Sequence, residues 1–234
     1  GSRKKLPTKW TMQKKNTWNK FVYIQGEYNH NTIPLFIKWF SQVIGLQKVT
    51  YDDILNQVFS IYFKSLDNEL LMSEFLSDNS FKKEWLSKLD RSITSVKMLS
   101  RLINDLPKER KISILNEIMS DGKLYPTKLT FAVIADLLNI SILLINRGDY
   151  GKFDQNKARN DVQNLKISSN FFQAHMQMHQ RPVLIFYVDG DKDKMMFYPI
   201  IDNSKKDKPY EEQLFMSYED TPEHIKILIR EHNS

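Results

Sequence analysis

The chain has 234 residues, of which 41% are hydrophobic and 26% are charged, and it contains no cysteine. This length and apolar content allow a buried core, which excludes a disordered tail and a disulfide-stapled mini-protein. Without cysteine the chain has no disulfide, no thiolate metal site and no cysteine nucleophile. No segment approaches the about 18 consecutive apolar residues of a transmembrane helix, so we expect no membrane partner and a cytoplasmic or nuclear location.

The net charge of +6 is concentrated at the N-terminus. Residues 1–20 hold seven bases and no acid, which leaves 27 of the 34 bases against all 28 acids in the remainder. We therefore expect residues 1–30 to form a basic, partly ordered leader and residues 31–234 to form one α+β domain. Lysines interleaved with tryptophans suit contact with nucleic-acid phosphates and bases. The candidate binding residues of this kind are Lys4, Lys5, Lys9, Trp10, Lys14, Lys15 and Trp18.

The first two thirds of the domain have the apolar periodicity of helices. Asn31 to Pro34 supply a cap and a first-turn proline for one helix, which is expected to end at Gly45. Thr50 caps a second helix, with Asp53 at its third position. Further helices are expected at 70–77, 81–90, 93–106 and 110–120, and another is expected to begin at Thr127.

Three short apolar runs then break the helical period and predict buried strands. They comprise residues 140–145, 183–188 and 195–201. The last two flank a polar loop that contains Gly190, which predicts a hairpin. With a closing helix from Thr221, the pattern predicts an α+β fold in which helices pack around a small, mostly buried sheet.

Residues 120–140 place Asp121-Gly122 before a helix that contains Ala135 and Leu138, and a strand follows from Ile140. This order resembles a segment of the ovarian-tumour (OTU) family of deubiquitinases. In that family a loop of the form D-G-x-W-G leads into a helix with an A-x-x-L pattern and then into a strand. The resemblance implies an OTU-like, cysteine-protease-type architecture with a core at about residues 50–202.

The family's nucleophilic cysteine lies in a helix start usually written G-D-C-L-F-R-A. Residues 52–58 resemble this motif, with Asp53 at the position of the aspartate and Ile54 at that of the cysteine. An alkyl side chain cannot attack a carbonyl, so the resemblance implies an inactive site.

The family's catalytic histidine belongs to a strand that presents a His-Tyr pair, and residues 195–200 resemble this strand. The histidine then falls on Met196, or on Phe197 if the alignment shifts by one residue. We expect Ile54 to pack against Met196 or Phe197, so that the former catalytic cleft is filled by apolar side chains.

These expectations describe a catalytically inactive OTU-like domain that acts as a protein-interaction or scaffolding module, with a ubiquitin-like protein as a candidate partner and no cofactor. We also expect a fragment of a larger protein, and the lysine-, asparagine- and isoleucine-rich composition is typical of AT-rich viral or protist genomes. One alternative is a nucleic-acid-associated domain that binds through residues 3–20. A further alternative is a metal-dependent hydrolase.

The hydrolase alternative depends on His175 and His179, which are four residues apart. In a helix both imidazoles would lie on one face, as in zinc sites. Met176 stands where a metalloprotease helix has its glutamate, and no third ligand is suggested nearby. We therefore expect a structural or surface pair and no metal, with zinc as the alternative.

Overall fold

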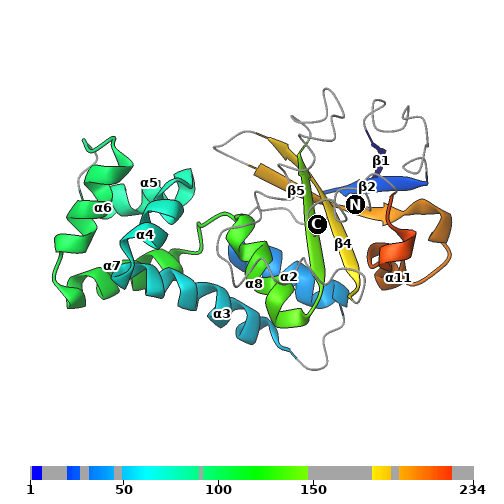
Figure 1. Ribbon diagram of the computed structural model, residues 1–234, viewed down its shortest axis with the longest axis horizontal. Coiled ribbons are helices and arrows are strands. Elements are labelled where there is room, and N and C mark those ends of the chain that lie inside the picture. Colours follow the sequence, from blue (N-terminus) through cyan, green and yellow to red (C-terminus); the bar gives the residue numbers. More distant parts are fainter. Residues whose placement is uncertain are drawn as a thin grey trace, which may run out of the picture.

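The computed structural model describes residues 2–6, 20–26, 32–44, 49–89, 92–146, 181–190 and 195–222. They form two lobes, one built around a five-stranded sheet and the other made of helices (Figure 1). One hydrophobic core cluster runs through both lobes, from Phe186 in the sheet to Trp85 and Ile103 among the helices, and a second one surrounds Tyr187 and Ile200 of the sheet. The α+β class expected from the sequence is confirmed.

The sheet has the strand order β1-β2-β5-β4-β3. Its strands are β1 (Ser2–Lys5), β2 (Phe21–Gln25), β3 (Ser141–Asn146), β4 (Val183–Gly190) and β5 (Met195–Asp202). β3 and β4 are parallel, whereas the other neighbouring strands are antiparallel. The expected strand near residue 140 and the expected hairpin of β4 and β5 are confirmed.

The structure corrects the expected leader of residues 1–30, because both of its described parts are strands of the same sheet. β1 pairs with β2, and β2 pairs with β5, where Val22 lies opposite Ile201. Phe21 and Ile24 are buried. The apolar run of β2 is only four residues long and follows Lys20, so the pairing with β5, which is distant in sequence, determines the strand.

Three helices accompany the sheet: α2 (Ile33–Ile44), α8 (Lys128–Leu138) and α11 (Tyr210–Leu214). α2 is amphipathic, since Phe36, Ile37 and Phe40 are buried whereas Lys38 is exposed. Its buried side packs on β4 through Phe36 and Phe186. α8 ends at Asn139, whose positive φ of 54° gives the left-handed conformation of a helix C-cap, and β3 follows directly.

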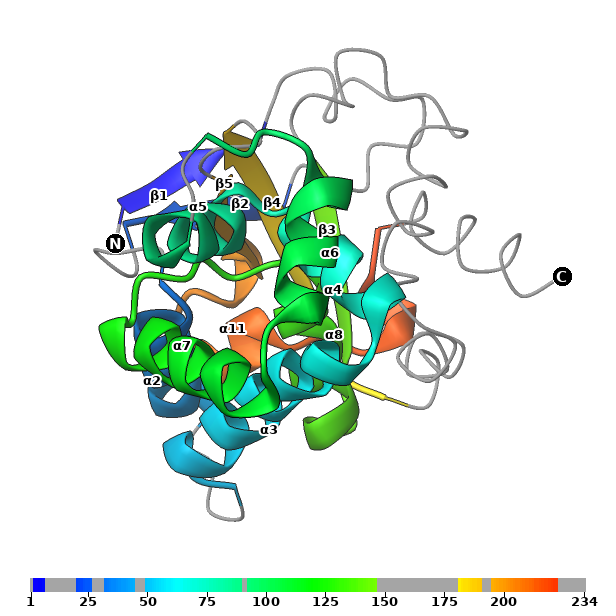
Figure 2. The same ribbon diagram turned by 90° about the vertical axis from the view of Figure 1, so that its left-hand side faces the viewer.

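The helical lobe contains α3 (Tyr51–Lys64), α4 (Glu69–Leu76), α5 (Asn79–Lys88), α6 (Val96–Asp105) and α7 (Lys108–Asp121). These helices confirm the expected ones, and α3 runs from beside α8 in the sheet lobe to the helical lobe (Figure 1). Figure 2 looks onto this lobe and shows α7 between α5 and α3. The aromatic rings of Tyr62, Phe75, Phe81 and Trp85 form its centre.

One other expectation cannot be placed. The closing helix predicted from Thr221 falls mainly after residue 222, outside the described residues. Among the helices that the structure describes, none combines the length and the apolar composition needed to cross a bilayer.

Candidate functional site

Asp53 and Ile54, the residues expected at the former nucleophile site, belong to the first turn of α3. The backbone N–H of Asp53 donates to Thr50 Oγ1 at 3.2 Å, and Asp53 Oδ2 accepts from the backbone N–H of Thr50 at 3.1 Å. This capping box lowers the pKa of Asp53, chiefly through the Thr50 backbone N–H. Ile54 is 0% exposed and belongs to the core. In this structure Asp53 is a helix cap and Ile54 is a packing residue.

The expected contact of Ile54 with Met196 or Phe197 is corrected by the arrangement of the described elements. α3 begins near the end of the sheet where β3 and β4 begin (Figure 1). β5 begins at the opposite end, where the β4–β5 hairpin turns. Phe197 contacts Phe131 of α8 instead, with ring centroids 4.6 Å apart. The helix that faces the start of β5 is therefore α8 and not α3.

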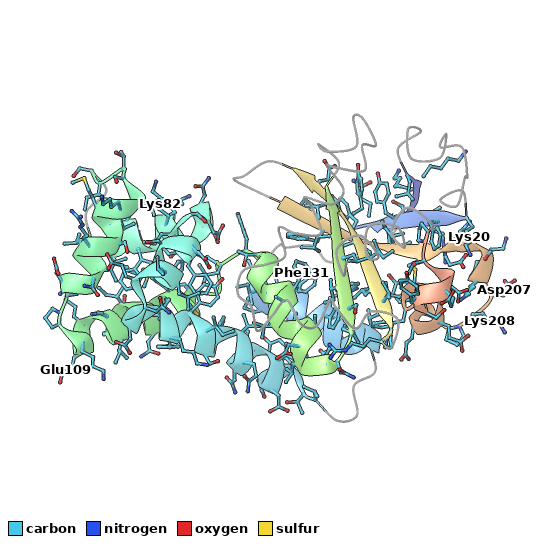
Figure 3. All side chains as sticks on the ribbon, viewed as in Figure 1. Lys20, Lys82, Glu109, Phe131, Asp207 and Lys208 are labelled. Atoms are coloured by element: carbon cyan, nitrogen blue, oxygen red, sulfur yellow. The ribbon has the colours of Figure 1, made fainter. Side chains whose placement is uncertain are left out.

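A cluster of four phenylalanines lies where α2, α8, β4 and β5 meet. Phe131, marked in Figure 3, is at its centre. Its ring centroid is 4.9 Å from that of Phe36, 5.2 Å from that of Phe186 and 4.6 Å from that of Phe197. All four side chains are at most 1% exposed. Tilted and edge-on pairs of this kind contribute about 0.5–1.5 kcal/mol beyond the burial of their area. We call these residues the phenylalanine cluster.

The first turn of α2 is attached to the loop that follows α7. The backbone N–H of Ile33 donates to the Leu124 carbonyl at 2.7 Å. Gly122 has a φ of +62°, which is the left-handed C-cap conformation, and a Cβ added there would lie 3.9 Å from Pro34 Cγ. The Asp121-Gly122 segment, which carries the family resemblance, therefore lies beside the start of α2.

A partly buried polar group lies where the two lobes join. The Ser80 hydroxyl donates to Asp78 Oδ2 at 2.7 Å and accepts from the backbone N–H of Tyr125 at 3.2 Å. The Tyr62 hydroxyl and Thr127 Oγ1 are also buried there, without a hydrogen bond of good geometry among the described residues. Burial raises the pKa of Asp78, and burial together with the Asp78 charge raises the pKa of Tyr62. The Asp78 carboxylate is therefore less stable here than in water.

We expect Asp78→Asn to raise the free energy of unfolding at neutral pH, because asparagine keeps the helix cap and removes the charge. The raised pKa means that folding favours the protonated carboxyl. The stabilising contribution of the Asp78 carboxyl to the free energy of unfolding is therefore present at low pH, and it is lost as the pH rises through the raised pKa. The difference in the free energy of unfolding between Asp78→Asn and the wild type should thus be largest at neutral pH and disappear on acidification. Urea denaturation across a pH series measures it, and a gain that grows toward low pH would contradict the assignment.

Two shallow depressions lie on either side of α7. One, of about 640 Å³, is bounded by Lys88, Glu109, Ile112, Ser113, Asn116, Glu117, Ser120 and Asp121. The other, of about 470 Å³, is bounded by Asn56, Phe59, Ser60, Phe63, Asn116, Met119 and Ser120. Asn116 and Ser120 border both depressions, so the two form one continuous area. We call it the α7 surface.

The remaining candidate residues are distributed as follows. Lys4 and Lys5 are exposed on the edge strand β1. Lys9, Trp10, Lys14, Lys15 and Trp18 lie outside the described residues, as do His175 and His179. Within the described part of the chain, no group of three or more histidine, cysteine, aspartate and glutamate side chains is arranged to hold a metal ion.

Comparisons with family models, with curated proteins and with solved structures gave no match to this chain.

Proposed function

We propose that this chain is a catalytically inactive, OTU-like domain that acts by binding another protein. The observation that carries the proposal is the phenylalanine cluster. It lies where α2, α8 and the start of β5 meet, which is where an OTU-like site would need a cleft. Phe131 is packed against Phe36, Phe186 and Phe197 at that point. Closely packed rings leave no room for a substrate or for water.

The start of α2 supports the OTU-like relationship better than the start of α3 does. Pro34-Leu35-Phe36 corresponds to the Cys-Leu-Phe part of the family motif, with Pro34 at the position of the nucleophile. Pro34 also lies beside Gly122 in the loop that carries the second family motif. We therefore move the proposed site of the lost nucleophile from Ile54 to Pro34.

The chemistry of these positions favours binding over catalysis. Acyl transfer by a cysteine protease requires a thiolate and an imidazole within hydrogen-bonding distance. Proline has no nucleophilic atom, and Phe197 cannot accept a proton. The aromatic rings stabilise the fold at the place where the reactive pair would act.

The α7 surface is the proposed docking site. Phe59 and Phe63 are half-buried on one side of it, and aromatic side chains of this kind are common anchors in protein interfaces. On the other side Lys88 is 3.1 Å from Glu117 and 3.8 Å from Asp121. With Glu109 this flank has three acids and one base. The surface therefore fits a partner that presents an apolar side chain beside basic groups, and ubiquitin is the first candidate.

Adding ubiquitin to the ¹⁵N-labelled chain should shift the amide resonances of α7 and of the adjoining faces of α3 and α5. Asn116→Arg should weaken binding at least about tenfold, because a long charged side chain would occupy the centre of the α7 surface. Asn104→Arg, at an exposed position of α6, is the matched control and should bind like the wild type. Shifts confined to other elements would reject the docking site. A titration without shifts at millimolar ubiquitin would reject ubiquitin as the partner.

A further inference from the structure

Basic residues from three distant parts of the chain meet at the corner of the sheet farthest from the helical lobe. β1 pairs with β2 so that Lys5 lies opposite Val22. The backbone N–H of Asn203 donates to the Lys20 carbonyl at 2.8 Å. Figure 3 shows Lys20, Asp207 and Lys208 at this end of the molecule. We call this region the basic corner.

Arg3 joins these parts through hydrogen bonds to neutral groups. Its guanidinium donates to Asn203 Oδ1 and to Gln213 Oε1, each at 2.9 Å. Neither amide oxygen carries a charge, so the positive charge of Arg3 is oriented but not neutralised. The contacts fix β1 to the segment that carries the lysines at 205, 206 and 208.

Bases outnumber acids at this corner. The bases are Arg3, Lys4, Lys5, Lys20, Lys205, Lys206 and Lys208, and the acids are Asp202, Asp207, Glu211 and Glu212. Asp202 is buried and lies 3.7 Å from Lys20, so this pair is neutral. Lys5, Lys206 and Lys208 are exposed, and none of them forms an ion pair with another described residue.

We propose that the basic corner binds nucleic acid through its phosphates, without sequence preference. Exposed lysines and arginines that gather from separate elements supply the electrostatic part of such binding. Lysines on an edge strand also prevent edge-to-edge pairing, but this role does not account for those at 205, 206 and 208. A membrane surface fits less well, because peripheral binding also uses exposed apolar side chains. Leu35, Leu70 and Met98, the exposed large apolar residues of the described part, lie on α2, α4 and α6.

The test uses fluorescence anisotropy with a labelled oligo-dT of about 20 nucleotides, longer than the about 4–16 nucleotides that one small binding domain covers. Wild-type affinity should fall steeply with salt. A variant with Lys205→Glu, Lys206→Glu and Lys208→Glu should bind at least about tenfold more weakly. Its logarithmic salt slope should be smaller by about two, since each lost contact to a single strand removes about 0.7.

The matched control reverses three exposed lysines of the helical lobe, with Lys83→Glu, Lys97→Glu and Lys108→Glu. It changes the net charge equally and should keep wild-type affinity within about twofold. Equal losses in both variants would overturn the proposal, because net charge alone would then explain binding. Binding to phosphatidylserine vesicles, but not to oligo-dT or to a duplex of the same length, would also overturn it in favour of a membrane. Far-UV circular dichroism checks that both variants are folded.

Discussion

Phe131→Ala should lower the free energy of unfolding by about 3–5 kcal/mol, the cost typical of removing a fully buried phenylalanine ring. The loss combines the transfer of the ring to water with the cavity left between α2, α8 and the sheet. Phe131 contacts Phe36, Phe186 and Phe197, so three elements lose a packing partner at once. Urea denaturation followed by far-UV circular dichroism measures the change.

Two control variants show whether the loss comes from packing. Phe131→Leu keeps much of the volume and should cost clearly less than the alanine variant. Leu70→Ala removes a side chain that is 81% exposed and should change stability by no more than about 0.5 kcal/mol. If Phe131→Ala cost no more than Leu70→Ala, the rings would not fill the space, and the proposed inactive site would lose its support.

Trp85→Ala should cost a similar amount, about 3–5 kcal/mol, in the other lobe. Trp85 is fully buried and lies against Phe81, with ring centroids 6.2 Å apart. Phe81 in turn contacts Tyr62 of α3 at 5.0 Å. The indole Nε1 has no hydrogen-bond partner among the described residues. Removing this unsatisfied group offsets a small part of the destabilisation.

The same variant tests whether the two lobes unfold together. The hydrophobic core is continuous from Trp85 through α3 to the sheet, which predicts one cooperative transition. Hydrogen exchange read by mass spectrometry should show α6 and β4 losing protection at the same urea concentration. Loss of protection in α6 while β4 stays protected would show that the lobes unfold separately.

The sequence predicted the helices best because their limits depend on nearby residues. Thr50 and Asp53 form their capping box within one turn, and the pattern of a cap with an acid three residues later is visible without a structure. Gly122 and Asn139 end α7 and α8 in the left-handed conformation that these residue types favour.

The sequence predicted neither the strands β1 and β2 nor the pairing of strands that are distant in the chain. β2 contains five residues, and its position becomes clear only from its pairing with β5. The parallel pairing of β3 with β4 joins segments separated by residues 147–182, and no local pattern specifies it. The short helix α11 was also missed, because it is held by contacts with β5 and α2.

For the candidate functional residues too, the sequence indicates local features but not positions that depend on distant contacts. The similarity of residues 52–58 to the family motif reflects a capped amphipathic helix, and this local feature does not specify where the helix lies relative to β5. The position of Pro34 depends on the hydrogen bond from Ile33 to Leu124, which is distant in sequence. The lysines at 205, 206 and 208 stand among Asp202, Asp207, Glu211 and Glu212, so their stretch looks neutral until folding places it beside β1 and Lys20.

The most direct test of the proposed function uses ubiquitin joined at its C-terminus, through an amide bond, to a fluorophore that emits before and after cleavage. Binding of this probe raises its anisotropy, whereas hydrolysis releases the small fluorophore and lowers the anisotropy. We expect the anisotropy to rise in proportion to occupancy of the α7 surface, to be lost in Asn116→Arg, and to be accompanied by no release above the buffer rate. Steady release that depends on the concentration of the chain would contradict an inactive site filled by phenylalanine rings.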